Sequence, residues 1–96
     1  MPHYVTLVRW TDKGVQEIMD APQRFAGIIK MVESMGGKIE IYSTMGEYDF
    51  VAVAEAPNDD VAMQAALQME SAGNARTTTM KAWTLEEAAK IIAKLE

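Results

Sequence analysis

Residues 45–56 constrain the fold most strongly, because a turn containing Gly46 leads directly into the most apolar segment of the chain. That segment, Tyr48–Ala56, alternates Val and Ala after Phe50 and stops at Pro57. A short apolar run between turn residues predicts a strand buried on both faces. Residues 38–45 alternate apolar and polar side chains, which predicts a half-solvated strand. The two strands are therefore expected to form a hairpin around Met45-Gly46-Glu47.

Two more strands and three helices are expected around this hairpin. Residues 3–10 and 75–83 are rich in β-branched or aromatic side chains, which favour strands. Apolar residues at spacings of three and four predict amphipathic helices on both sides of the hairpin. Cap, proline and glycine positions set their limits. The expected helices run from Asp20-Ala21-Pro22 to Gly36-Gly37, from Asn58 or Asp59 to Ala72-Gly73-Asn74, and from the Thr84–Glu87 capping box to Leu95, with a short helical turn at 15–19.

The order strand–helix–strand–strand–helix–strand, followed by a further helix, predicts an α+β fold of the ferredoxin-like sandwich type. Ninety-six residues are enough for a single domain, residues 1–96. Right-handed crossovers predict a four-stranded, largely antiparallel sheet in the order four, one, three, two. Strands one and three are expected to be central and to run parallel to each other.

The charge balance disfavours several classes of partner. Nine basic residues are scattered among fourteen acidic ones, and the net charge is −5. A nucleic-acid or anionic membrane surface needs clustered Lys and Arg, so neither partner is expected. No apolar run approaches the roughly 20 residues of a membrane span. The chain has no cysteine and no secretory signal pattern, which favours a cytoplasmic location. No cofactor motif is present.

The central strands predict self-association. Val5 and Leu7 lie on one side of the first strand, whereas Val8 and Trp10 lie on the other. Two crossover helices cover only one face of the sheet, so a lone chain would leave roughly several hundred Å² of apolar surface wet. Either the C-terminal helix folds back over this face or a second copy covers it. We favour a sheet-on-sheet homodimer about a two-fold axis.

Three segments carry a resemblance to a known family. They are Tyr4–Leu7 with Trp10-Thr11, Thr44-Met45-Gly46-Glu47-Tyr48-Asp49, and Gly73-Asn74 with Arg76–Thr79. Together they resemble the GYD-domain family of small bacterial and archaeal proteins over nearly the whole chain. The resemblance implies a dimeric α/β-barrel built from ferredoxin-like subunits. It implies little chemistry, although related barrels include cofactor-free monooxygenases.

Parallel first and third strands would bring a set of chemically useful groups to one end of the sheet: His3, Tyr4, Glu47, Tyr48, Asp49, Lys81 and Trp83. In this arrangement His3 could act as a general base and Tyr48 as a proton donor beside Asp49. The alternative is structural. Asp49 then pins the hairpin turn, Tyr48 packs over it, and His3 is a solvated terminal residue.

The opposite end is expected to collect Arg9, Trp10, Lys38, Glu55 and Arg76. Arg76 could bind a carboxylate or phosphate, or it could pair with Glu55 or Asp12. Trp10 and Trp83 could line a ligand pocket, although large aromatic residues in a small domain usually belong to the core or an interface. One histidine and no cysteine predict no metal site.

Two functions remain open from the sequence. One is a self-associating module that binds a small ligand between sheet and helices. The other is a cofactor-independent small-molecule enzyme, monooxygenase- or isomerase-like, that uses Tyr48 and Asp49 with His3. A closed pocket of roughly 300 Å³ or more that contains Tyr48 or Asp49 would favour the enzyme or a ligand-binding function. A filled core, with Asp49 bonded to the amides of the turn, would favour the module.

Overall fold

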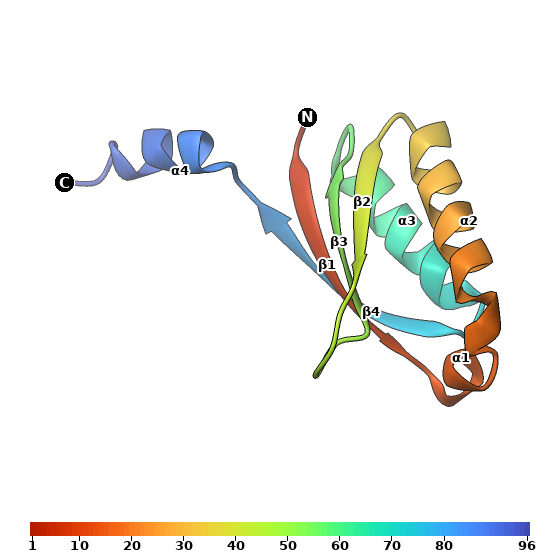
Figure 1. Ribbon diagram of the computed structural model, residues 1–96. Helices are drawn as coiled ribbons and strands as arrows, with labels where there is room; N and C mark the ends of the chain where they lie inside the picture. The colour runs from red at the N-terminus through yellow and green to blue at the C-terminus, as the bar shows by residue number, and fades with distance from the viewer.

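The computed structural model describes all residues, 1–96, and its elements follow the expected order (Figure 1). A short helix and a 3-10 turn stand where one helical turn was expected. The elements are β1 (His3–Trp10), α1 (Asp12–Gln16), η1 (Ile18–Asp20), α2 (Ala21–Ser34), β2 (Lys38–Ser43), β3 (Phe50–Glu55), α3 (Asp59–Ser71), β4 (Ala75–Ala82) and α4 (Leu85–Ile92).

The four strands form one sheet in the order β2-β3-β1-β4. Listed from the other edge, this is the order four, one, three, two. All three strand pairs are antiparallel, so the expected parallel pairing of β1 and β3 is wrong. The reason is geometric. The α2 crossover returns β2 in the direction of β1, and the hairpin then reverses the chain before β3 enters the gap between them.

Local chemistry sets the helix limits. Pro22 stands in the first turn of α2, but the Asp20 side chain makes no capping bond, contrary to expectation. The Asn58 side chain caps α3 by accepting from the Val61 N–H at 2.9 Å. The expected capping box of α4 is confirmed between Thr84 and Glu87. Gly36 follows α2 with φ +86°, the left-handed conformation that favours glycine.

The core lies between the sheet and the layer formed by α2 and α3, which both cover the same face (Figure 1). Val8 and Phe50 are 0% exposed at its centre. The Phe50 ring lies 4.9 Å from the Trp10 ring and 5.0 Å from the Phe25 ring, between centroids. The sheet face that carries these side chains, the covered face, therefore has an aromatic core at one end.

The other face of the sheet has no layer over it. It carries the alternate residues of each strand, with Val5 and Leu7 on β1 and Val51 and Val53 on β3. Val53 is 41% exposed and Met80, on β4, is also exposed. Charged residues such as Lys38, Glu40 and Arg76 stand at its edges. We call this surface, centred on Val5, Leu7, Val51, Val53 and Met80, the open face.

Helix α4 does not cover the open face of its own chain. It projects away from the body, on the side of the sheet opposite α2 and α3 (Figure 1). Leu85 is 90% exposed and Leu95 is 74% exposed. An isolated helix shorter than about 12 residues is marginal in water. The structure thus leaves both the open face and the apolar side of α4 without a partner within one chain.

Candidate functional site

The register of the sheet separates the side chains that a parallel β1–β3 pair was expected to bring to one end. His3 lies opposite Glu55 on β3 and Ala82 on β4. Tyr48 and Asp49 immediately precede β3 and therefore lie at the far end of β1, where the Asp49 N–H donates to the Val8 carbonyl oxygen at 2.8 Å. The expected grouping of His3 with Tyr48 and Asp49 is wrong, because it depended on a parallel β1–β3 pair.

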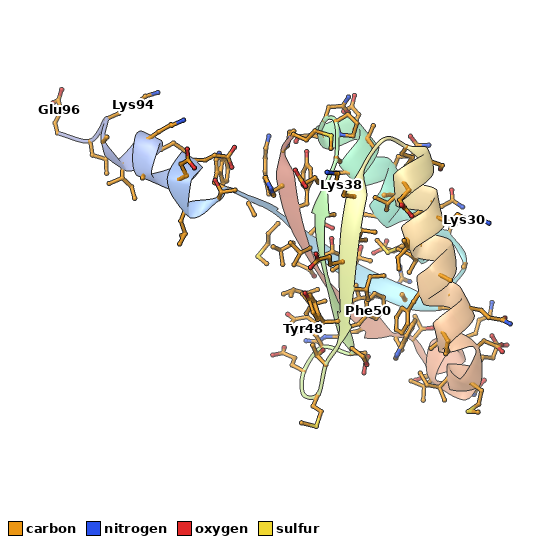
Figure 2. The ribbon with its side chains drawn as sticks, turned by 45° about the horizontal axis from the view of Figure 1, so that its top comes forward. Lys30, Lys38, Tyr48, Phe50, Lys94 and Glu96 are labelled. Carbon is orange, nitrogen blue, oxygen red and sulfur yellow. The ribbon has the colours of Figure 1, made fainter.

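Each end of the sheet therefore holds part of each expected group. Figure 2 shows the separation through Lys38 and Tyr48, which lie at opposite ends. One end, the His3 end, holds His3, Tyr4, Lys38, Glu55, Lys81 and Trp83. The other, the Asp49 end, holds Arg9, Trp10, Glu47, Tyr48, Asp49 and Arg76.

Asp49 joins the hairpin to the end of β1. Its Oδ2 accepts from the Trp10 N–H at 2.7 Å, and its carbonyl oxygen accepts from the Thr44 N–H at 3.0 Å. A carboxylate that accepts from a backbone N–H holds that segment in place. The contact supports the structural interpretation of Asp49, with the bond made to the Trp10 amide.

Tyr48 packs beside the same strand end. The Arg9 guanidinium lies 4.9 Å from the centre of the Tyr48 ring and donates a hydrogen bond to Glu47. Gly46 has φ +106°, which a residue with a side chain rarely adopts. The Gly-Glu-Tyr-Asp turn is therefore held against the end of β1 by contacts of Glu47, Tyr48 and Asp49.

The segment after Trp10 is attached to the turn before β4. The Thr11 N–H donates to the Asn74 carbonyl oxygen at 2.9 Å, and the Thr11 hydroxyl donates to the Gly73 carbonyl oxygen at 2.6 Å. A Cβ on Gly14 would collide with the Asn74 carbonyl oxygen, so α1 approaches this turn closely only because position 14 is glycine. Parts of the three segments that carried the sequence resemblance, namely Trp10-Thr11, residues 44–49 and Gly73-Asn74, thus meet at the Asp49 end.

A cavity of about 360 Å³ opens at this end, between α2, α3 and the sheet. Trp10 forms one wall, and its ring packs on both Phe25 and Phe50. The lining is mainly apolar and consists of Trp10, Arg24, Gly27, Ile28, Met31, Phe50, Gln68, Met69, Ala72, Asn74 and Ala75. We call it the α2–α3 cavity. Trp10 was expected at a ligand site and lines it, whereas Arg76, Trp83, Tyr48 and Asp49 do not.

Two polar residues that the sequence did not point to, Arg24 and Asn74, also line the α2–α3 cavity. The side chain of Arg24 is only 14% exposed; it lies 5.1 Å over the Trp10 ring and donates to the carbonyl oxygens of Gly14 and Glu17. Asn74 has a buried Oδ1 without a hydrogen-bond partner. The only sequence signal for Arg24 was its place in the first turns of α2, two residues after Pro22.

A second polar group forms at the His3 end. The Tyr4 hydroxyl donates to Asp59 at 2.5 Å, and the Lys81 ammonium lies 3.0 Å from the same carboxylate. Burial, followed by the hydrogen bond to Asp59, raises the pKa of Tyr4 to about 12. The bond from Tyr4, followed by that from Lys81, holds the pKa of Asp59 below its ordinary value. These groups join the start of α3 to the sheet.

His3 lies between two carboxylates. Its Nε2 is 3.6 Å from Glu55 and its Nδ1 is 3.8 Å from Glu87, on the first turn of α4. Trp83 is exposed just before that helix. Arg76 forms neither of the ion pairs that were considered, with Glu55 or with Asp12.

No three His, Asp or Glu side chains are grouped as metal ligands would be. No helix has the length and apolar character of a membrane span.

Comparisons with known proteins agree with the architecture. The family model of the GYD domain matches residues 4–92. A Thermus thermophilus protein described as a glutamine synthetase and cystathionine beta-lyase binding protein is 31% identical over 98 residues, which cover 100% of both chains. The solved structure of TTHA0845 from the same species is 26% identical, with a TM-score of 0.51 over 88% of this chain and 95% of that one.

A more distant structure shares the fold alone. It is the feast or famine regulatory protein of Mycobacterium tuberculosis, solved in complex with L-methionine, with 19% identity and a TM-score of 0.66. The match covers 88% of this chain and 51% of that protein, so this chain spans about half of its length.

Proposed function

Because this chain belongs to the GYD-domain family, we propose that it is a small binding module that self-associates and holds a small molecule in the α2–α3 cavity. One observation carries the proposal. The segments around Trp10, Asp49 and Asn74, which are distant in sequence, are bonded to one another at the wall of this cavity. Its volume lies within the roughly 300–1,000 Å³ typical of small-molecule sites.

The geometry favours binding over catalysis. The enzyme hypothesis required His3, Tyr48 and Asp49 together, and the antiparallel register separates them. Tyr48 and Asp49 do not line the α2–α3 cavity. Asp49 is bonded to the backbone amide of Trp10, which is a structural contact, although the module hypothesis expected bonds to the turn amides and a filled core.

Self-association follows from the open face. Its centre is apolar and its rim is charged, which is the usual anatomy of an interface core and edge. A second copy packed sheet to sheet about a two-fold axis would cover Val53 and Met80. It would also meet α4, since the helix projects on that side (Figure 1). The apolar side of α4 would then rest on the partner copy, and Arg76 would lie at the interface edge.

Binding to a partner enzyme is a second candidate function, and it is favoured by the description of the Thermus relative. We propose that this chain likewise binds glutamine synthetase or cystathionine β-lyase of its own host. Mixing the purified proteins and measuring a mass increase by size-exclusion chromatography with light scattering tests this directly. The cytoplasmic location expected from the cysteine-free sequence stays a prediction.

Native mass spectrometry of protein purified from its own host tests the main proposal. We expect two subunits and one additional small mass per subunit. The matched variants are Gly27→Leu and Gly27→Ala. A Cβ at Gly27 meets nothing within 4 Å, so both variants should fold, but only leucine should fill the mouth of the cavity. Gly27→Leu should lose the small mass and keep the dimer. Bare single subunits in the wild-type spectrum would contradict the proposal.

A further inference from the structure

We infer that Glu70 closes the free edge of β4, and that without Glu70 this edge pairs with β4 of a second copy. The inference goes beyond the proposed function, because it concerns the edge of the sheet and neither the α2–α3 cavity nor the open face. It gives a physical reason why association through the open face would stop at two copies.

The strand β4 has backbone groups that no other strand satisfies. It pairs with β1 on one side only, because the sheet ends at β4. The Thr77 N–H points away from β1, since it donates to a side chain of α3. Backbone directions alternate along a strand, so the N–H groups of Thr79 and Lys81 point the same way. Both residues are exposed, and such an edge is a template for another strand.

Glu70 occupies the first part of this edge. Its Oε2 accepts from the Thr77 N–H at 2.9 Å and from the Thr77 hydroxyl at 2.8 Å. These two bonds, and more weakly the charge of Arg76, hold the pKa of Glu70 below its ordinary value. An incoming strand would have to displace this charged group in order to reach Thr77. The part of the edge that stays open, residues 79–81, is shorter than a typical strand of about 5–6 residues.

A second copy of β4 fits the opened edge. The segment can pair antiparallel with itself about a two-fold axis through Thr79, so that Thr77 of one copy lies opposite Lys81 of the other. Its run of three threonines favours strand pairing. A groove of about 360 Å³ adjoins the edge, between α3 and β4, and contains Met63 and Leu67, which are 65% and 54% exposed. The same axis would bring these apolar side chains of the two copies together.

Lys81 does not protect the edge as Glu70 does. A lysine on an edge strand normally opposes pairing with another strand, because its charge would have to be buried. The Lys81 ammonium lies 3.0 Å from the Asp59 carboxylate, so its charge is already compensated within the chain. The protection of this edge therefore depends on Glu70.

Three substitutions in the full-length chain test the role of the hydrogen bond. Glu70→Ala removes the acceptor, whereas Glu70→Gln keeps an amide oxygen that can accept from the Thr77 N–H. Thr79→Pro removes the N–H at the centre of the edge, and proline is tolerated where an edge N–H faces solvent. Circular dichroism checks that each variant is folded, and sedimentation velocity over a concentration series measures its mass.

We expect Glu70→Ala to reach twice the mass of the wild type, and Glu70→Gln to keep the wild-type mass. Thr79→Pro, added to Glu70→Ala, should restore the wild-type mass. The same doubling is expected in a Val53→Lys background, so the test does not depend on association through the open face. An unchanged mass of Glu70→Ala would overturn the inference. So would an increase that Glu70→Gln shares or that Thr79→Pro does not reverse.

Hydrogen exchange of the backbone amides tests the contact in the unmodified chain, which needs no variant to fold. After correction for intrinsic rates, the Thr77 N–H should exchange about tenfold or more slowly than those of Thr79 and Lys81, because only Thr77 is bonded on this edge. Equal exchange of the three amides would contradict the closed edge, whereas slow exchange of Thr77 alone would support it.

Discussion

The two faces of the sheet have similar apolar centres but opposite surroundings. On the covered face, Val8 and Phe50 are fully excluded from water by α2 and α3. On the open face of β3, the strand that carries Phe50, Val51 is half-buried and Val53 is exposed. The crossover connections account for the difference, since two helices of this length cover one face only. One face is therefore completed within the chain, and the other is complete only in an assembly.

The largest expected effect is on the covered face. Phe50→Ala should lower the free energy of unfolding by about 3–5 kcal/mol, because it removes a fully buried ring from the centre of the aromatic core. Urea unfolding followed by circular dichroism measures this. Val51→Ala is the matched control on the adjacent, open-face position. An equal loss of unfolding free energy in both variants would show that the two faces are equally buried in the single chain, contrary to the structure.

Next in size is a charge placed on the open face. Val53→Lys should weaken self-association about 100-fold or more, or about 2.7 kcal/mol, because burying a lysine at an apolar interface is costly even with Glu40 as its cross-strand neighbour. Sedimentation velocity over a concentration series measures the dissociation constant. Met19→Lys, on an exposed position of η1, should leave it unchanged. Undiminished association of Val53→Lys would show that the interface lies elsewhere.

The bond between Asp49 and Trp10 joins the hairpin edge to the covered core. Asp49→Asn should lower the free energy of unfolding by about 1–3 kcal/mol, as the bond from the Trp10 N–H to Oδ2 is weakened. Thermal and urea unfolding check this, with Glu33→Gln, on the exposed side of α2, as the control. A fully stable Asp49→Asn protein that had lost only ligand binding would assign Asp49 to the site itself.

Alkaline pH should act differently on tyrosines of the two faces. Burial and the bond to Asp59 raise the pKa of Tyr4 from its ordinary value of 10.0 to about 12, so the folded state keeps a proton that the unfolded state loses. The stabilisation is complete below pH 10 and is lost as the pH rises to about 12. Tyr4→Phe should remove this pH dependence. The bond to Glu40 also raises the pKa of Tyr42, on the open face. Tyr42→Phe should nevertheless change the dependence of the unfolding free energy on pH less than Tyr4→Phe does.

The smallest effect is expected from the C-terminal arm. In the Val53→Lys background, removal of residues 84–96 should change the free energy of unfolding by no more than about 0.5 kcal/mol, because the apolar side chains of α4 are exposed. In the wild-type background, the same truncation should weaken self-association. Loss of stability in the single subunit would mean that α4 packs on its own chain.

Much of the fold could be predicted because local patterns specify it. Apolar spacing located the strands and long helices, and Thr84-Leu85-Glu86-Glu87 predicted a capping box that the structure contains. The strands beside the hairpin are shorter than expected, since residues 44–49 form the turn. The relative direction of β1 and β3 was wrong. The direction depends on counting chain reversals, and the prediction contained the hairpin but did not count the reversal that it makes before β3.

The candidate site was harder to predict than the fold. That one error in direction placed His3 beside Tyr48 and Asp49, although the register puts it beside Glu55. Arg24 and Asn74 could not be found from the pattern, because their setting depends on loops that meet only in three dimensions. Trp10 was a correct candidate, since a large aromatic residue at the end of a central strand lies where the helix layer begins.

Sedimentation equilibrium of the unmodified chain at low micromolar concentration tests the central claim most directly. We predict the mass of two 10.6 kDa subunits, as expected if Val5 and Leu7 are buried between them. A stable single subunit at this concentration, with its own α4 lying over the open face, would contradict the account.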